Sequence, residues 1–345
     1  MKRTLALAAT TALVAAPALA QDLNVVGSWS GLPLHKQYEQ PFWEETLPEA
    51  SGGDINVALT THDQMGLGVG DIYRLLGQGV YDVAMTVADY AVADAPELEG
   101  LDVPLVATDA ADARAMVDAA RPMVEDIYRD RFNSHVLAIA PYPPQVVFCN
   151  AEISGLDDLA GLKVRASGRM TAKFLEARGA EGVNVAFSEV PGALQKGVVD
   201  CAVTGAGSGY SAGWWEVSTH LLPIPLGGWD SVVTAINLDK WNSLSPETQE
   251  LISSTIETEF EDPAWATAQD ALAGDIACLT GNGECPAGES RDMMLVEASE
   301  ADIEKAREIL ISEVLPDWAE RAGAEWAARW NASVGEAVGV QVPVN

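Results

Sequence analysis

The chain has 345 residues, of which 20 are Lys or Arg and 51 are Asp or Glu, giving a formal net charge of −31. A negative charge of this size argues against nucleic acid and anionic membrane surfaces as partners. Because 48% of the residues are hydrophobic and 10 are Trp, the chain is not a disordered acidic tail, and its length is enough for two domains.

Residues 1–20 are predicted to be an export signal. Lys2 and Arg3 precede an unbroken small and apolar stretch that ends in A-L-A at 18–20, before the polar Gln21. A charged start, an apolar centre and an A-x-A end are the parts of a secretory signal peptide. The alternative, a buried helix or an uncleaved anchor, is disfavoured because the stretch is short for a spanning helix. We therefore expect a periplasmic protein that begins near Gln21.

Strands and helices alternate in the first part of the mature chain. A strand is predicted from Leu23 to Ser28, a helix over 35–51 and a second strand over 55–60. The loop THDQMGLGVG then leads to a helix that begins at Asp71. This alternation is typical of a parallel α/β unit.

The same alternation returns further along the chain. We expect strand 161–167, helix 169–180, strand 183–187, helix 188–197 and strand 199–204. No Ser/Pro-rich linker separates the two units, so the chain is expected to cross between them through strands. The sequence therefore predicts an α/β protein with two lobes.

The last third is predicted to be mostly helical. A strand over 232–238 precedes a helix that Ser245 caps, with Pro246 and Glu247 in its first turn. Trp318, Trp326 and Trp330 follow at helical spacing. We interpret these three as packing residues, and the same holds for the pair at 214–215.

The pattern L-x-x-G-V-x-D-x-A-x-T occurs twice, over 76–86 and over 194–204. Each copy predicts a helix end, a left-handed glycine cap at Gly79 or Gly197, and a short buried strand. Each strand then ends in a threonine, Thr86 or Thr204. Ligands of open α/β sheets bind at the carboxyl ends of strands, so both threonines are candidate site residues.

The four cysteines are even in number, which in an exported chain favours disulfides. Cys278 and Cys285 bracket a glycine-rich loop and are expected to form a local bridge. Cys149 and Cys201 each lie in a strand-like stretch, and neighbouring strands of one sheet could bring them together. Free buried thiols are the alternative.

No arrangement of residues predicts catalysis, a cofactor or a metal site. GLGVG at 66–70 lacks the spacing and the lysine of a phosphate-binding loop, and GAGSG at 205–209 does not satisfy G-x-S-x-G. The 4 His residues form no recognisable triad or metal pattern. An exported hydrolase remains the alternative from another functional class.

Arg165 stands out because it follows Val164 at the end of a predicted buried strand in a chain with few basic residues. A buried arginine needs an anionic partner. The partner could be the carboxylate of a ligand or one of the 51 acidic residues of the chain. From the residues alone, the two possibilities stay open.

Two stretches resemble the DctP-type solute-binding proteins of tripartite ATP-independent periplasmic (TRAP) transporters. The first is GLDDLAGLKVRASG at 155–168, which is followed by VNVAFSEVPGALQKGVVDCAVTG at 183–205 and by STH. The second, HDQMGLGVGDIYRLLGQGVYDVAMT at 62–86, resembles the segment of that family with the pattern Q-x-G, helix, G-x-x-D. The resemblance covers nearly the whole mature chain. It implies two α/β lobes that close over a ligand.

The resemblance also implies roles for single residues. Arg165 matches the arginine that clamps the ligand carboxylate, Phe187 matches a residue that packs on the ligand, and Thr204 matches a polar position. Gln145 falls near the position at which some members, such as sialic acid binders, carry a second arginine. Because Gln145 is neutral, it argues against a second anionic group on the ligand, or a sugar acid.

Two tryptophans complete the predicted site. Trp29 and Trp229 fall at loop positions that face the cleft in similar proteins, although each could equally be a packing residue. An aromatic cleft would favour a flat or apolar carboxylate.

The predicted architecture follows from this resemblance. Lobe I is expected to comprise 21–142 and 232–270, and lobe II to comprise 143–231 and 271–345 with the C-terminal helices. The expected function is periplasmic capture of a small organic carboxylate and its delivery to the small and large membrane subunits of a TRAP transporter, without catalysis, cofactor or metal. The alternative within this fold is a binding protein that serves a sensor kinase or another transporter class.

Overall fold

The computed structural model describes residues 20–107 and 109–344. The predicted signal peptide lies outside the described residues, apart from Ala20. Within the described ranges, no helix is long and apolar enough to cross a membrane.

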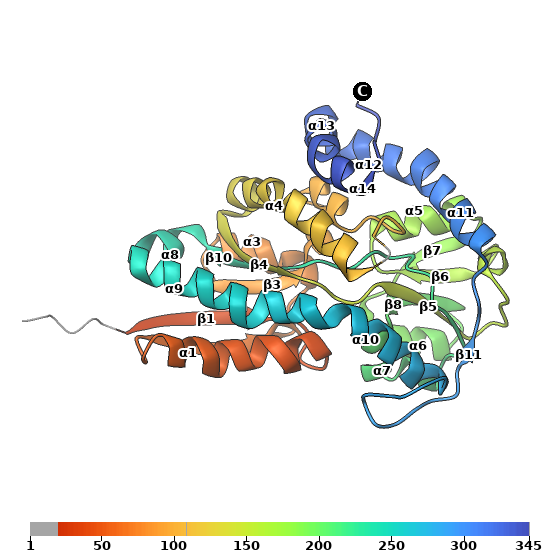
Figure 1. The fold of residues 1–345 in the computed structure, drawn as a ribbon, viewed down its shortest axis with the longest axis horizontal. Helices are drawn as coiled ribbons and strands as arrows, with labels where there is room; N and C mark the ends of the chain where they lie inside the picture. Colours follow the sequence, from red (N-terminus) through yellow and green to blue (C-terminus); the bar gives the residue numbers. More distant parts are fainter. Residues whose placement is uncertain (1–19, 108, 345) are drawn as a thin grey trace, which may run out of the picture.

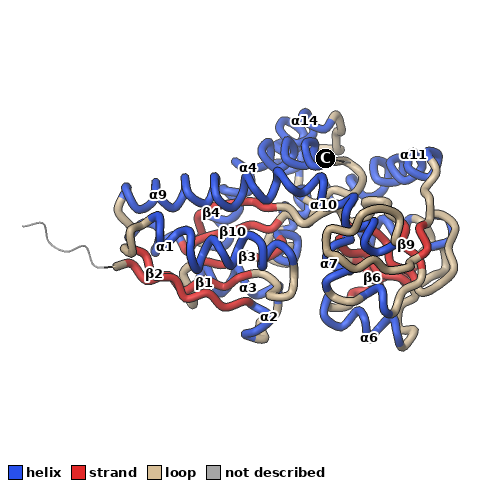
Figure 2. The backbone as a smooth tube through the Cα atoms, turned by 60° about the horizontal axis from the view of Figure 1, so that its bottom comes forward, coloured by secondary structure: helices blue, strands red, loops and turns tan. Residues whose placement is uncertain are grey.

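The described strands form two mixed sheets, as the two-lobe prediction requires, and Figure 2 shows them side by side. The first has the order β2-β1-β3-β10-β4 and the second the order β11-β9-β5-β8-β6-β7. The first sheet contains β1 (Gln21–Gly27), β2 (Ile55–Thr61), β3 (Val83–Val87), β4 (Ser134–Ala140) and β10 (Val232–Asn237). The second contains β5 (Gln145–Cys149), β6 (Lys163–Ala166), β7 (Glu181–Asn184), β8 (Cys201–Gly205), β9 (His220–Leu222) and β11 (Met294–Leu295).

The chain passes between the sheets at two neighbouring crossings, from β4 to β5 and from β9 back to β10. The two crossings are hydrogen-bonded to each other, because Gln145 N donates to Gly228 O at 3.0 Å and Tyr142 N donates to Asp230 O at 3.4 Å. A third passage is made by α10 (Asp262–Thr280), which runs from one sheet to the other (Figures 1 and 2). The sheets are thus joined by backbone at one side of the space between them.

Helices cover both sheets (Figure 1). Those between the strands of the first sheet are α1 (Leu47–Ala50), α2 (His62–Met65), α3 (Ile72–Gly77) and α4 (Ala110–Phe132). Those of the second are α5 (Arg169–Ala177), α6 (Val190–Gln195) and α7 (Ala206–Ser211). After β10 come α8 (Leu238–Ser243) and α9 (Pro246–Ile256), and Ser245 caps α9 as predicted, its side chain accepting from Thr248 N.

The C-terminal helices pack against both halves of the molecule. They are α11 (Glu300–Ile309), α12 (Leu315–Ala322), α13 (Ala324–Trp330) and α14 (Glu336–Val338). Trp318 and Trp330 are buried and donate from Nε1 to the carbonyl oxygens of Pro96 and Gly100, at 3.1 and 2.9 Å. Their predicted packing role is confirmed, and they tie this region to the turn that follows β3.

The repeated sequence pattern is also a structural repeat. Helix α3 is followed by β3, and α6 is followed by β8, with a glycine at the helix end in both cases. Gly79 has a φ of 71° and Gly197 a φ of 66°, the left-handed conformation that glycine adopts without a steric penalty. Both strands pair with a parallel strand on one side and an antiparallel strand on the other.

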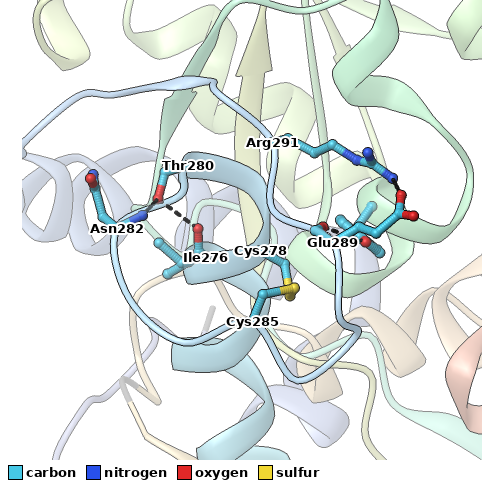
Figure 3. Close-up of a disulfide and its surroundings, with 8 residues drawn as sticks. Ile276, Cys278, Thr280, Asn282, Cys285, Glu289 and Arg291 are labelled. Atoms are coloured by element: carbon cyan, nitrogen blue, oxygen red, sulfur yellow. Dashed lines mark hydrogen bonds and ion pairs between the residues drawn. A yellow bond between two sulfur atoms is a disulfide. The ribbon is translucent and has the colours of Figure 1, made fainter.

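Both predicted disulfides are present. Cys149 and Cys201 occupy directly paired positions of β5 and β8, so the bridge crosslinks two neighbouring strands. Cys278 and Cys285 join the last turn of α10 to the loop that follows it (Figure 3). In the same close-up, Arg291 is paired with Glu289 beyond the bridge, at 3.1 Å between Nη2 and Oε2.

Candidate ligand-binding site

Arg165 is held at the end of β6 by backbone contacts. Its Nε donates to Val185 O at 3.0 Å and its Nη1 donates to Val203 O at 2.7 Å, so strands and loops on both sides orient the guanidinium. The residue is 3% exposed. Among the described residues, no carboxylate oxygen lies within ion-pair distance of it. A salt bridge between Arg165 and an acidic residue of the chain, the alternative left open by the sequence, is therefore not formed among the described residues.

Trp29 is the centre of an aromatic cluster that joins the two halves of the molecule. It follows β1, and its ring lies 4.5 Å from that of His62, 5.8 Å from Tyr90 and 6.2 Å from Tyr142, centroid to centroid. Phe187, which comes from the other half, is 6.1 Å away. Burial lowers the pKa of His62 to about 4, so that this ring is neutral at pH 7.

Arg165 and this aromatic cluster enclose a cavity between the two sheets. Its free space, which includes the open mouth, is about 290 Å³. The lining residues are Trp29, Leu32, Val87, Tyr90, Tyr142, Gln145, Arg165, Phe187, Thr204, Ser208 and Asp230. Of the seven residues predicted from the sequence, the structure thus brings together Arg165, Thr204, Phe187, Gln145 and Trp29.

Two larger hollows adjoin the cavity. One shares Trp29, Tyr90, Arg165 and Phe187 with it, and the other is reached past Tyr142 and Ser208, which line both spaces. The second hollow is bordered by Pro286 and Ala287, which directly follow the disulfide-bonded Cys285. The cavity is therefore the narrow middle of a longer cleft between the two halves.

Two predicted site residues lie elsewhere. Thr86 is buried inside β3, where its backbone N–H donates to Tyr73 Oη at 3.1 Å. The next residue, Val87, lines the cavity instead, because successive side chains of a strand point to opposite faces. Trp229 is 1% exposed and packs in the core, donating from Nε1 to Ala107 O at 3.0 Å.

Four polar or aromatic lining residues were not anticipated: Tyr90, Tyr142, Ser208 and Asp230. Asp230 directly follows Trp229, which was the residue predicted from the sequence. An acidic residue after Gly-Gly-Trp, in a segment that crosses between the lobes, could have indicated that Asp230 lines the cavity. Asp230 has a φ of 37°, a left-handed conformation that aspartate tolerates better than most residues.

Gln145 lines the cavity and is held within it. It is fully buried, and its Nε2 donates at 2.6 Å both to Gly227 O and to Asp230 Oδ1. A second cationic group is thus absent from this position. Among the described residues that line the cavity, Arg165 is the only one with a positive charge.

Three carboxylates form a cluster beside the cavity, and one of them, Asp230, lines it. Oxygen atoms of Asp89, Asp102 and Asp230 lie within 4.8 Å of one another, the kind of group that can hold a metal ion. Burial raises the pKa of Asp89 and of Asp230 well above the ordinary value, and raises that of Asp102 to about 6. The site therefore combines one buried cation with an adjacent acidic cluster.

The sequence profile of the DctP family, bacterial extracellular solute-binding protein family 7, matches residues 30–276. The chain belongs to this family. Its members are solute-binding receptors, and the two sheets with their helices match the two-lobe periplasmic binding protein fold.

Several solved structures share this fold. DctP7 of Bordetella pertussis, an extracytoplasmic solute receptor binding pyroglutamic acid, has 19% identity and a TM-score of 0.78, covering 93% of this chain and 100% of its own. A marine metagenome TRAP protein specific for pyroglutamate has 20% identity and a TM-score of 0.79, covering 93% and 99%. A TRAP protein from Rhodoferax ferrireducens with bound malonate has 17% identity and a TM-score of 0.78, covering 92% and 98%.

Proposed function

We propose that this DctP-family protein captures one small organic carboxylate in the cavity between its lobes. The observation that carries the proposal is Arg165, a buried guanidinium that lines the cavity and has backbone partners but no carboxylate within ion-pair distance among the described residues. A planar guanidinium can present two parallel N–H groups to a carboxylate. The ligand carboxylate would supply an anion in direct contact with the guanidinium.

The rest of the lining supports a flat or apolar ligand body. Trp29, Tyr90, Tyr142 and Phe187 surround the cavity with aromatic rings, which offer apolar area at small cost in conformational entropy. With a single cation in the lining and a carboxylate beside it, a second anionic group on the ligand would be repelled. The site favours monocarboxylates over dicarboxylates.

Closure of the two lobes would trap the ligand. The lining comes from both halves, with Trp29 and Tyr90 on one side and Arg165 and Phe187 on the other. A ligand that contacts both sides stabilises the closed arrangement by the contacts it makes only there. The two hydrogen-bonded crossings and α10 are the places where a hinge motion would occur.

Similar proteins bind small carboxylates. Relatives with this fold bind pyroglutamate or orotic acid, each with one carboxyl group, whereas another has bound malonate, a dicarboxylate. The preference for a single carboxylate therefore rests on the lining of this chain and not on these relatives. We further propose that the mature protein works in the periplasm and delivers its ligand to the small and large membrane subunits of a TRAP transporter. It would have no catalytic activity.

A thermal-shift screen of small carboxylates, followed by calorimetric titration, tests the proposal. A ligand at a hundredfold excess over its Kd should raise the free energy of unfolding by about 2.7 kcal/mol. The carboxamide of each compound is the matched control, because it keeps the shape and removes the charge. Equal shifts by acid and amide, or no shift by any carboxylate, would contradict carboxylate capture.

Delivery needs a separate test. Uptake of the identified ligand into vesicles that contain the TRAP membrane subunits should require this protein and an ion gradient. Ligand binding without any uptake, together with stimulation of a sensor kinase, would favour the alternative of a sensing protein.

A further inference from the structure

The three carboxylates of the acidic cluster come from distant parts of the chain. Asp89 lies in the turn after β3, Asp102 follows the turn Pro96–Leu101, and Asp230 precedes β10. Their closest oxygen atoms all lie within 4.8 Å of one another, and Asp89 and Asp102 are 7% and 6% exposed. Three negative charges at this separation repel one another strongly in a medium from which water is excluded.

Few charges nearby offset this repulsion. Arg165 on β6 is the cation that acts on Asp89 and Asp230, whereas Glu99 adds a further negative charge. Glu99 is paired with Arg321 of α12, which donates to both carboxylate oxygens of Glu99 at 2.5 Å. The cluster thus depends on the same guanidinium that faces the cavity.

Hydrogen bonding at the cluster is incomplete. Gln145 is fully buried and donates to Asp230 Oδ1, but its own Oε1 has no partner among the described residues. Asp89 Oδ1 is also buried without a partner in this part of the chain. Two unpartnered buried acceptors call for a hydrogen-bond donor, and the O–H of a protonated carboxyl group is such a donor.

We propose that Asp89, Asp102 and Asp230 together form a proton-binding site, and that the protein takes up a proton when a carboxylate ligand binds. This inference rests on the proposed function. A ligand carboxylate neutralises Arg165, which removes the positive charge that offsets the cluster. A proton on the cluster then restores the charge balance of the closed cleft.

Closure of the two lobes also favours protonation of the cluster. Asp89 lies against Gly168 at the start of α5 in the other half, where an added Cβ would be 1.9 Å from its Oδ2. Closing the lobes therefore removes water from this carboxylate. The raised pKa of all three groups, caused first by burial, agrees with a proton held in the closed arrangement.

A metal ion is the competing occupant. Asp102 Oδ1 already accepts from Asp230 N at 2.8 Å, and Asp230 Oδ1 accepts from Gln145 Nε2 at 2.6 Å. A calcium ion takes about 6 to 8 oxygen ligands. Two of the carboxylates thus have oxygens committed to N–H donors, which favours a shared proton.

Calorimetric titrations with pyroglutamate and orotate, from about pH 6 to about pH 9 in two buffers of different ionisation enthalpy, test the proposal. Net proton uptake should accompany binding, and Kd should rise by up to about tenfold per pH unit above the pKa of the cluster. Asp102→Asn keeps an oxygen that can accept from Asp230 N but removes a titrating carboxyl group, so it should reduce the dependence of Kd on pH. Glu261→Gln removes a buried carboxylate that lies outside the cluster and lines neither the cavity nor the two hollows, and it should leave the pH dependence unchanged.

Infrared difference spectroscopy adds a second readout. Binding of a probe near neutral pH should increase the carbonyl band of a protonated carboxyl group, and Asp102→Asn should diminish this increase. A bound probe with no change in this band would overturn the proposal. Binding without proton uptake would also overturn the proton-binding site, and so would binding that weakens when a chelator removes divalent cations. Either result would leave the proposal of carboxylate capture intact.

Discussion

Arg165 on β6 donates a hydrogen bond from Nη1 to the carbonyl oxygen of Val203 on β8, at a distance of 2.7 Å. Val203 directly precedes Thr204, which lines the cavity. Together with the contact from Nε to Val185 O, this bond fixes the guanidinium plane. Donors on Nη1 and Nη2 remain for a ligand. The same residue thus serves sheet structure and the proposed carboxylate contact.

Arg165→Ala should abolish most of the affinity for the carboxylate. Leaving a desolvated carboxylate without its partner costs about 2 to 5 kcal/mol, or a factor of roughly thirty to several thousand in Kd. Arg165→Lys should recover only part, since a point charge cannot present two parallel donors. Calorimetric titration beside a thermal melt of the ligand-free variant is the measurement. Unchanged affinity with a lowered Tm would mean that the arginine is structural only.

The two disulfides should differ in their effect on stability. In the chain-entropy relation, the sequence separation of 52 between Cys149 and Cys201 predicts a contribution of about 4 kcal/mol to the free energy of unfolding. The separation of 7 between Cys278 and Cys285 predicts about 2.5 kcal/mol. Denaturant unfolding of the two double Ser variants should show this order. A larger loss from the short loop would contradict it.

The repeated glycine caps should be equivalent in energy. Gly79→Ala and Gly197→Ala would each place a Cβ in open space, with a nearest contact of 4.0 Å for the first and nothing within 4 Å for the second. Each should therefore lower the free energy of unfolding by about 1 kcal/mol through the left-handed backbone alone. Gly192→Ala, in α6 with ordinary φ and nothing within 4 Å, is the control and should be stabilising. Unequal losses at the two caps would contradict equivalence.

Asp275 should make stability depend on pH. Burial raises the pKa of this carboxyl on α10 from 3.8 to about 6. Because the folded-state pKa is the higher one, the contribution to stability is complete below about pH 4 and is lost as pH rises through about 6. Asp275→Asn should raise the free energy of unfolding by about 1 to 2 kcal/mol near pH 8 and change little near pH 4. Denaturant melts at both values test the sign, and a variant that is less stable near pH 8 would refute it.

Much of the fold could be predicted because its signals are local. The helix cap at Ser245 and the left-handed glycines at 79 and 197 follow from hydrogen bonding and sterics within a few residues. The Cys149–Cys201 bridge followed from two strand-like stretches that one sheet could align. Arg165 was recognisable because a basic residue ending a buried strand is costly without an anion.

The cavity lining depended on side-chain direction, which local patterns leave open. Thr86 and Val87 are adjacent, and the pleat of β3 determines that Val87 rather than Thr86 lines the cavity. Trp229 and Asp230 are likewise adjacent, and the left-handed backbone at Asp230 turns the two side chains to different surroundings. In both pairs, the residue chosen from the sequence was the neighbour of the one that lines the cavity.

The sequence by itself determined the family, the two α/β units, both disulfides and the buried arginine, because short-range periodicity, caps and a family motif encode them. Only the tertiary structure decided that Asp89, Asp102 and Asp230 meet within 4.8 Å. Their convergence depends on the register of two sheets and on two chain crossings, which no local pattern records. The physical reason is that mutual repulsion and desolvation act through space, between groups that lie far apart along the chain.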